Sequence, residues 1–415
     1  MRRGWAWMRV VWWMALTAPL MAWGQAKSPI AERGNPKQDS CYVREVKSLP
    51  GSHAFAADFI EVMATDPRPT ARDRNTVWAL TADLNTDLPA EERALYISKS
   101  SNGGETWTQV ARVDSRYFDS GIDEGLRNGL SVVPGGREFA ITTQKGAFQV
   151  IPHGPDAVVK YIEGPRVPHD RPWISIPKKE GDPVRAAAVK MTADGKRLFV
   201  GYGYFDMEPQ LFAYHKGREG AWVEDGPLPQ LPTDLDIFSM EFDRPRDPRP
   251  GSLYVGTGDQ VYRLDLRTIK WIEIQGVEPD SAIHGINTVG GLHLAACWGV
   301  YVPVGPDKVG RLTDAEFIYH KDDDETGPNV RAYGIEIDPA RPSRQVVTAL
   351  TGVYISRDSG GSWKRLNELP EGEYRTAHFN ADGTVIISGM PGTFVANPFS
   401  GACLPHLKTR EKPDE

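Results

Sequence analysis

The stretch Gly352–Trp363, G-V-Y-I-S-R-D-S-G-G-S-W, decides the fold of this chain. It opens on a short run, Gly352–Ser356, in which apolar and polar residues alternate as in a strand. The chain then passes through Asp358–Gly361, where an Asp side chain can accept backbone N–H bonds and Gly adopts positive φ angles at low steric cost. Trp363 follows and is placed to fold back over the turn and bury a large apolar surface. The stretch therefore predicts a tight β-hairpin.

A second copy of this pattern lies far upstream at Ser100–Trp107, S-S-N-G-G-E-T-W, with Asn in place of Asp. The shared pattern, S-x-[D/N]-x-G-x-[S/T]-W, resembles the Asp-box of BNR-repeat proteins. That repeat occurs in sialidases, in sortilin-type domains and in certain photosystem assembly factors. The resemblance implies a β-propeller. It implies no active site, because Asp-boxes in these families lie on outer hairpins of the blades.

Residues 1–24 have the features of a secretory signal peptide. Arg2, Arg3 and Arg9 give a basic start, residues 10–20 are apolar, and residues 22–24 end in small residues suited to cleavage. The apolar run is too short for a comfortable membrane span, and no Cys follows the cleavage point to carry a lipid anchor. We therefore expect an exported protein, periplasmic or secreted, with no membrane insertion after cleavage.

The composition of the remaining chain excludes several classes of partner. Removal of the three arginines of the signal segment changes the formal charge from −7 to −10. An acidic chain without basic clusters argues against binding to nucleic acid or to anionic membranes. The 41 Gly and 33 Pro residues fit a turn-rich fold, and no segment has sustained helical periodicity. We expect an all-β protein that is a monomer.

A repeated unit, in which an apolar strand leads through a polar turn to a second strand, recurs at intervals of about 40 to 70 residues. Its first strands are predicted at 59–63, 129–133, 187–191, 238–242, 284–288, 333–337 and 376–379. Seven units favour a seven-bladed β-propeller over residues 25–403, with a charged tail at 404–415. Six or eight blades are alternatives, and a two-sheet sandwich is the competing fold, although it does not explain seven repeats.

The last unit is one strand short, and residues 41–46 form a strand that belongs to no unit. The simplest solution is that this N-terminal strand completes the last blade and closes the ring. Cys41 and Cys403 would then lie close together, where an exported protein can keep a disulfide. The alternative is that both cysteines are free. Cys297 lies in an apolar strand and is expected to be a buried small hydrophobic residue.

Propellers bind ligands at the mouth, where the innermost strands begin. The sequence places four arginines at equivalent positions there, and these are Arg127, Arg185, Arg331 and Arg375. A guanidinium group binds carboxylate or phosphate in a bidentate manner, so convergent arginines suit an acidic glycan or an acidic protein surface. Alternatively, they pair with Asp58, Asp234 and Asp236 and only stabilise the mouth.

Catalysis at this mouth is the rival hypothesis, and the candidate residues are His284, His378, Tyr333 and Tyr374. A sialidase would combine an arginine cluster with a Tyr–Glu nucleophile pair, for which Tyr374 with Glu371 or Glu373 is the nearest match. The F/Y-R-I-P stretch of sialidases is missing, since the nearest string, Arg166-Val167-Pro168, lies in mid-chain. A uronate lyase would need a His or Tyr base beside an arginine, and residues 169–171 (H-D-R) are a second place for such a set.

We predict no metal site and no cofactor. The acidic run 322–325 lacks the alternating spacing and the glycine of a calcium loop. The zinc-protease, phosphate-loop and dinucleotide motifs are also missing. The leading hypothesis is therefore an exported propeller that binds an anionic ligand or an acidic partner without catalysis. The alternative is a carbohydrate-active enzyme, a sialidase-like exo-glycosidase or a uronate lyase, acting on acidic glycans.

Overall fold

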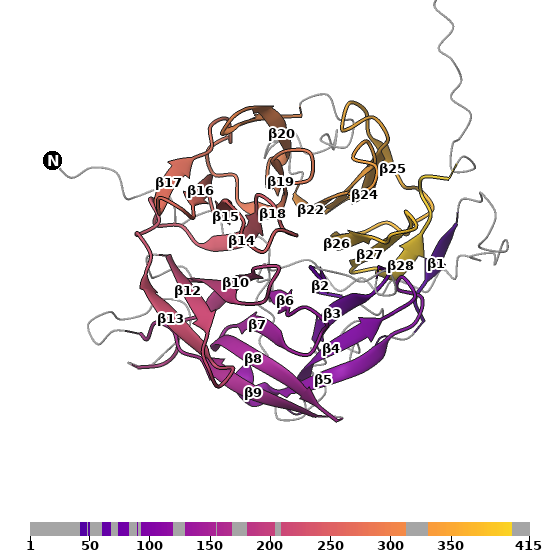
Figure 1. Ribbon diagram of the computed structural model, residues 1–415. Helices are drawn as coiled ribbons and strands as arrows, with labels where there is room; N and C mark the ends of the chain where they lie inside the picture. The colour runs from indigo at the N-terminus through magenta and orange to yellow at the C-terminus, as the bar shows by residue number, and fades with distance from the viewer. Residues whose placement is uncertain are drawn as a thin grey trace, which may run out of the picture. The chain divides into compact units, whose positions relative to one another are not determined.

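The computed structural model describes residues 42–47, 49, 60–67, 74–82, 89, 93–118, 129–154, 156–167, 181–203, 209–312 and 331–400, all within the unit Pro36–Glu415. Seven four-stranded antiparallel sheets are arranged in a ring, which makes a seven-bladed β-propeller (Figure 1). Each inner strand contacts the inner strands of the two neighbouring blades, so the ring is closed. The predicted fold class is confirmed. Among the described residues no helix is long and apolar enough to cross a membrane.

Each blade runs outward from an inner strand to a peripheral one. The inner strands are β2 (Val62–Thr65), β6 (Leu130–Val132), β10 (Ala186–Met191), β14 (Ile237–Phe242), β18 (Ile283–Asn287), β22 (Ala332–Ile337) and β26 (Tyr374–Phe379). The second strands are β3 (Val77–Ala82), β7 (Phe139–Thr143), β11 (Arg197–Tyr202), β15 (Ser252–Thr257), β19 (His293–Ala296), β23 (Gln345–Ala349) and β27 (Val385–Gly389).

The outer half of each blade is built in the same way. The third strands are β4 (Ala94–Ser100), β8 (Gly146–His153), β12 (Gln210–Lys216), β16 (Val261–Asp265), β20 (Gly299–Gly305), β24 (Gly352–Ser356) and β28 (Gly392–Ala396). The outermost strands are β5 (Thr108–Asp114), β9 (Asp156–Ile162), β13 (Trp222–Pro227), β17 (Lys270–Glu273), β21 (Lys308–Arg311), β25 (Lys364–Arg365) and β1 (Val43–Glu45). One short 3₁₀ helix, η1 (Ser115–Tyr117), follows β5.

The N-terminal strand closes the ring as the sequence predicts. β1 pairs antiparallel with β28, with Val43 opposite Ala396 and Glu45 opposite Phe394. The buried Val46 extends this pairing, because its N–H donates to the carbonyl of Thr393 at 2.8 Å. A strand from the start of the chain thus supplies the outermost strand of the last blade. The predicted disulfide partners Cys41 and Cys403 lie outside the described residues, as do the signal segment 1–24 and the tail 404–415.

The core lies between the blades, where the faces of neighbouring sheets pack together. The second strands contribute most to it. In β3, β7, β19, β23 and β27 every residue is buried. This explains their continuous apolar sequence, since both faces of a second strand are covered by adjacent blades. The predicted first strands agree with the inner strands to within about three residues, the largest difference being in β2, which begins at Val62 and not at residue 59.

The two turns that carry the repeated motif share most of their hydrogen bonds. In the β24–β25 turn, Asp358 accepts bonds from the N–H and hydroxyl of Ser362, and Trp363 Nε1 donates to the carbonyl of Gly360. In the β4–β5 turn, Asn102 accepts from the N–H of Thr106, and the indole of Trp107 again donates to a backbone carbonyl. The predicted hairpin and the folded-back Trp are confirmed, and both lie on the outer half of a blade.

Candidate functional site

Five consecutive inner strands share a β-bulge near their first residue. In β10, β14, β18, β22 and β26 the register against the second strand shifts by one residue at the second position. A bulge leaves one residue without a partner in the ladder and re-aims its side chain, and bulges are common beside functional sites. The residues at this position are Ala187, Phe238, His284, Tyr333 and Arg375. The described parts of β2 and β6 pair without such a shift.

Four of these bulged residues touch one another in blade order. The rings of Phe238 and His284 have centroids 5.7 Å apart, and those of His284 and Tyr333 are 5.5 Å apart. The guanidinium carbon of Arg375 lies 5.8 Å from the centre of the Tyr333 ring. We call Phe238, His284, Tyr333 and Arg375 the mouth row. It runs across four neighbouring blades at the end of the ring where the inner strands begin, which we call the mouth.

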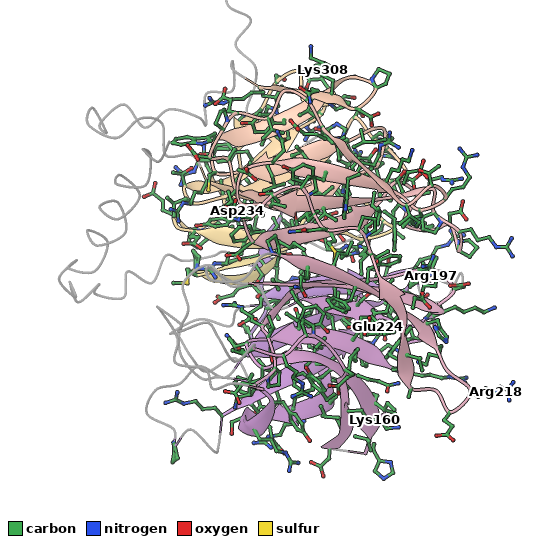
Figure 2. The ribbon with its side chains drawn as sticks, turned by 90° about the vertical axis from the view of Figure 1, so that its left-hand side faces the viewer. Lys160, Arg197, Arg218, Glu224, Asp234 and Lys308 are labelled. Carbon is green, nitrogen blue, oxygen red and sulfur yellow. The ribbon has the colours of Figure 1, made fainter. Side chains whose placement is uncertain are left out.

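The mouth and the opposite face are separated by the length of the inner strands. In the side view of Figure 2, Asp234, which precedes β14, lies on the left of the blades. Arg218, in the turn between β12 and β13, lies at the far right. The segments that precede the inner strands thus face one side of the ring, and the turns between third and outermost strands face the other. The mouth is therefore remote from the Asp-box-like turns.

Charged groups surround Tyr333. Arg375 Nε donates to Glu373 Oε1 at 2.6 Å, and both side chains are mostly buried. Arg331, which is exposed and precedes β22, hydrogen-bonds with the Tyr333 hydroxyl. Burial raises the pKa of Tyr333 and the charge of Glu373 adds to this, while the two arginines oppose it. The phenol therefore stays protonated at neutral pH and can act as a hydrogen-bond donor or acceptor.

The turns between second and third strands form the rim of the mouth in the last three blades. The backbone N–H groups of Cys297, Leu350 and Met390 donate to the carbonyls of Ala282, Arg331 and Glu373, the residues that precede or begin the inner strands. Leu350 and Met390 are 39% and 41% exposed, which is high for large apolar side chains. Cys297 occupies the same position in its blade. The mouth therefore presents apolar groups beside the polar mouth row.

The structure brings some of the predicted arginines together and separates others. Arg331 and Arg375 both act on Tyr333. Arg185 precedes β10 and is buried, with only 4% of its surface exposed. Asp234 is exposed and Asp236 is partly exposed in the segment before β14. The other predicted mouth residues, Asp58, Arg127 and Asn128, lie outside the described residues, as do the H-D-R set at 169–171 and the acidic run 322–325.

The four candidates for catalysis fall into three places. His284 and Tyr333 are neighbours in the mouth row. Tyr374 is fully buried in the core of its blade, and its hydroxyl donates to the carbonyl of Pro370 at 3.0 Å. His378 lies near the far end of β26, where burial and the charge of Arg246 lower its pKa to about 4. The geometry therefore joins His284 with Tyr333, while Tyr374 has a packing role in the described structure.

A second polar cluster lies at the far end of the inner strands. Lys190 Nζ pairs with Glu241 Oε2 at 2.6 Å, across the boundary between β10 and β14. The pKa of Glu336 is raised to about 8, chiefly by burial and also by the charge of Glu241, while the charge of Lys190 opposes this rise. Glu241 is on β14 and Glu336 is on β22, and the strand β18 lies between these two strands. The two carboxyl groups therefore interact across the centre of the ring and not between adjacent strands. Sequence reasoning missed this cluster, although Lys190, Glu241, Glu336 and His378 all occupy the penultimate position of an inner strand.

The described residues contain no group of three or more His, Cys, Asp or Glu side chains that could hold a metal ion. Cys297 is the one cysteine among them, and it is partly exposed. The expected burial of Cys297 is therefore wrong, because the residue falls in the rim turn after β19 and not within the strand.

A scan against protein-family models found no matching family, and a search of curated proteins found no similar sequence.

Proposed function

We propose that this chain is an exported β-propeller of the Asp-box, or BNR-repeat, kind that binds an anionic ligand at its mouth without catalysing a reaction. The family assignment is supported by the two turns that share one hydrogen-bond pattern, Ser100–Trp107 and Ser356–Trp363. In each turn a Ser hydroxyl accepts the N–H of a Gly four residues later, at 2.8 Å. Export is supported by the basic and apolar character of residues 1–24.

The observation that carries the binding proposal is the convergence of Arg331 and Arg375 on Tyr333. Arg331 is exposed and makes no ion pair with the described residues, so its charge is available to an incoming carboxylate. Arg375 forms an ion pair with Glu373, which balances its charge. Arg375 would therefore orient a bound carboxylate more than it would attract one. Tyr333 is only 8% exposed, so the partly exposed ring of Phe238 is the flat surface of the mouth row on which the apolar face of a sugar ring or a planar side chain can rest.

This chemistry favours an acidic glycan, with an acidic protein surface as the second class of partner. A carboxylate bound by Arg331 leaves the ring of the sugar beside the mouth row and close to the exposed Leu350 and Met390. Ligand sites combine a mostly apolar surface with a few well-placed polar groups, and this mouth has that composition. We propose no cofactor, no nucleic acid and no membrane insertion, and we expect a monomer.

Catalysis on an acidic glycan is a second candidate function, and one observation favours it. His284, Tyr333 and Arg331 come together, as a uronate lyase would require of a base and a carboxylate-neutralising arginine. The raised pKa of Tyr333 argues against the phenolate that such a base would need. Glu373 is held by Arg375 and Tyr374 is buried, so a sialidase-like nucleophile pair has no support in the described residues.

The experiment is thermal unfolding of the mature protein with a panel of sialic acid, uronates, their oligosaccharides and acidic peptides. A ligand at 100 times its Kd should stabilise the folded state by about 2.7 kcal/mol. The shift should disappear in Arg331→Ala and Arg375→Ala, each compared with its own ligand-free sample. Arg218→Ala, on the opposite face, is the matched control and should keep the full shift.

Four outcomes separate the alternatives. A shift with acidic sugars that is lost in both mouth variants supports the glycan site. A shift with acidic peptides alone would assign the mouth to a protein partner. Chemical change of an oligosaccharide during the incubation, absent with Arg331→Ala, would replace the binding proposal by the enzymatic one. No shift with any acidic compound would contradict the proposed function.

A further inference from the structure

Cys297 and His284 form a pair at the mouth that the ligand-binding proposal does not use. The Sγ atom of Cys297 lies 3.3 Å from Nε2 of His284. The two residues come from different segments, since His284 is the bulged residue of β18 and Cys297 follows β19. The Cys297 N–H donates to the carbonyl of Ala282 at 3.0 Å, which fixes the rim turn against the start of β18. The contact is therefore built into the blade and not made by two mobile side chains.

Both side chains of the pair remain accessible. Cys297 and His284 are partly exposed, whereas Ala295 and Ala296, which precede the cysteine in β19, are completely buried. In the next two blades the position of Cys297 is held by Leu350 and Met390, and both are about two-fifths exposed. A cysteine that only filled space in the core would be expected within β19, like the buried Ala295 and Ala296. Cys297 is instead a partly exposed residue of the rim turn.

Charged and aromatic groups flank the neighbours of this pair. On the side of β22 and β26, the charged groups that the structure describes around Tyr333 are Arg331, Arg375 and Glu373, and the last two pair with each other. On the side of β14, the ring of Phe238 packs edge-on against His284, and Asp236 precedes that strand. An adjacent histidine is a surrounding in which cysteines become reactive, because it can take the thiol proton and the thiolate is the nucleophile.

We propose that Cys297 and His284 form a reactive thiol–imidazole pair that exchanges with small disulfides. His284 accepts the proton of the thiol, and the Cys297 sulfur attacks one sulfur atom of the disulfide. A new S–S bond forms to Cys297, the original S–S bond breaks, and the departing thiolate takes the proton back from the imidazolium. One disulfide and one thiol are consumed, and one mixed disulfide and one thiol are produced. The added group then lies beside the mouth row. This inference holds whether or not the mouth binds an acidic ligand.

The test measures the rate at which Cys297 reacts with dithiobis(nitrobenzoate), a dianionic aromatic disulfide. Peptide mass spectrometry assigns the added group to Cys297, because the chain has two further cysteines, Cys41 and Cys403. At about pH 6.5 the rate should fall at least fivefold in His284→Gln, and the two rates should approach each other near pH 9, where an ordinary thiol is ionised. The matched control is His153→Gln, an exposed histidine at the end of β8, which should react like the parent.

A second measurement needs no variant. With neutral iodoacetamide at about pH 6.5, Cys297 should be alkylated faster in the folded protein than in urea, where the pair with His284 is lost. Equal rates for the parent and His284→Gln, or slower alkylation in the folded state, would overturn the proposal. Cys297→Ser should remove the product at this site and leave any reaction at the other cysteines unchanged.

Discussion

Tyr333 and Arg375 lie at the same β-bulge position of neighbouring inner strands, with the Arg375 guanidinium carbon 5.8 Å from the centre of the Tyr333 ring. This relationship repeats between blades, since His284 stands in the same way beside Tyr333. The bulge therefore places side chains of neighbouring blades next to one another at the mouth. Each of the five blades with a bulge places one side chain at this position of the mouth, and the residue type there sets the local chemistry.

The ion pair between Arg375 and Glu373 should contribute measurably to stability. Both side chains are mostly buried, at 24% and 17% exposed, so Arg375→Ala leaves the Glu373 carboxylate with a desolvation cost and without this partner. We expect a loss of about 1 to 3 kcal/mol in the free energy of unfolding, measured in urea. The double variant Arg375→Ala/Glu373→Gln should regain part of this loss. The exposed pair of Arg44 with Glu105 is the control, and Arg44→Ala should cost less than about 1 kcal/mol. Equal losses for both arginines would contradict the prediction.

The Asp-box-like turn should tolerate Asn but not Ala at position 358. Burial opposes ionisation of Asp358, but hydrogen bonds from Ser362 and Ser356 outweigh it and lower its pKa. Asp358→Ala should cost about 1 to 2 kcal/mol, whereas Asp358→Asn should cost less than about 0.5 kcal/mol, because Asn102 already serves in the other turn.

The pH dependence of the same variants provides a second readout. The pKa of Asp358 is lower in the folded state than in the unfolded state, where it is near 4, so the ionised carboxylate stabilises the fold above about pH 4. This stabilisation is lost as the pH falls through the pKa of the folded state. Thermal unfolding between about pH 2 and pH 6 should therefore show a steeper acid loss for the parent than for Asp358→Asn. Identical acid profiles would show that the Asp358 charge plays no part in the turn.

Glu336 should destabilise the protein at alkaline pH. Its folded-state pKa is raised from 4.5 to about 8, so the folded state holds a proton that the unfolded state releases. Stability is then greatest below about pH 4.5 and falls as the pH rises toward 8. Glu336→Gln removes this titration and should be more stable than the parent by about 1 to 3 kcal/mol at pH 8, with little difference at pH 5.

The matched control for Glu336 is Glu224→Gln, an exposed glutamate of β13. Urea unfolding at several pH values should show the same profile for this control and the parent. A constant difference between Glu336→Gln and the parent at all pH values would indicate a packing effect and not a protonation effect.

Much of the fold could be read from local sequence. The motif with Asp358 and Trp363, and its copy with Asn102 and Trp107, makes its hydrogen bonds within eight residues, so the sequence alone determines its geometry. The seven apolar first strands were predicted for the same reason, because alternation and turn residues act over a few positions. The closing role of β1 followed from counting strands, since an unpaired edge at the end of the ring needs a partner.

The candidate site was decided by the tertiary structure. Arg185 and Arg331 hold equivalent positions in the sequence repeat, yet one is buried and the other exposed, because neighbouring blades cover them differently. The proximity of His284 to Cys297 depends on a bulge and a turn that local patterns do not specify. The electrostatic interaction of Lys190 and Glu241 with Glu336 depends on closure of the ring, which brings together strands distant in sequence. Local chemistry thus determined the blades, and only their packing around one axis determined which side chains meet.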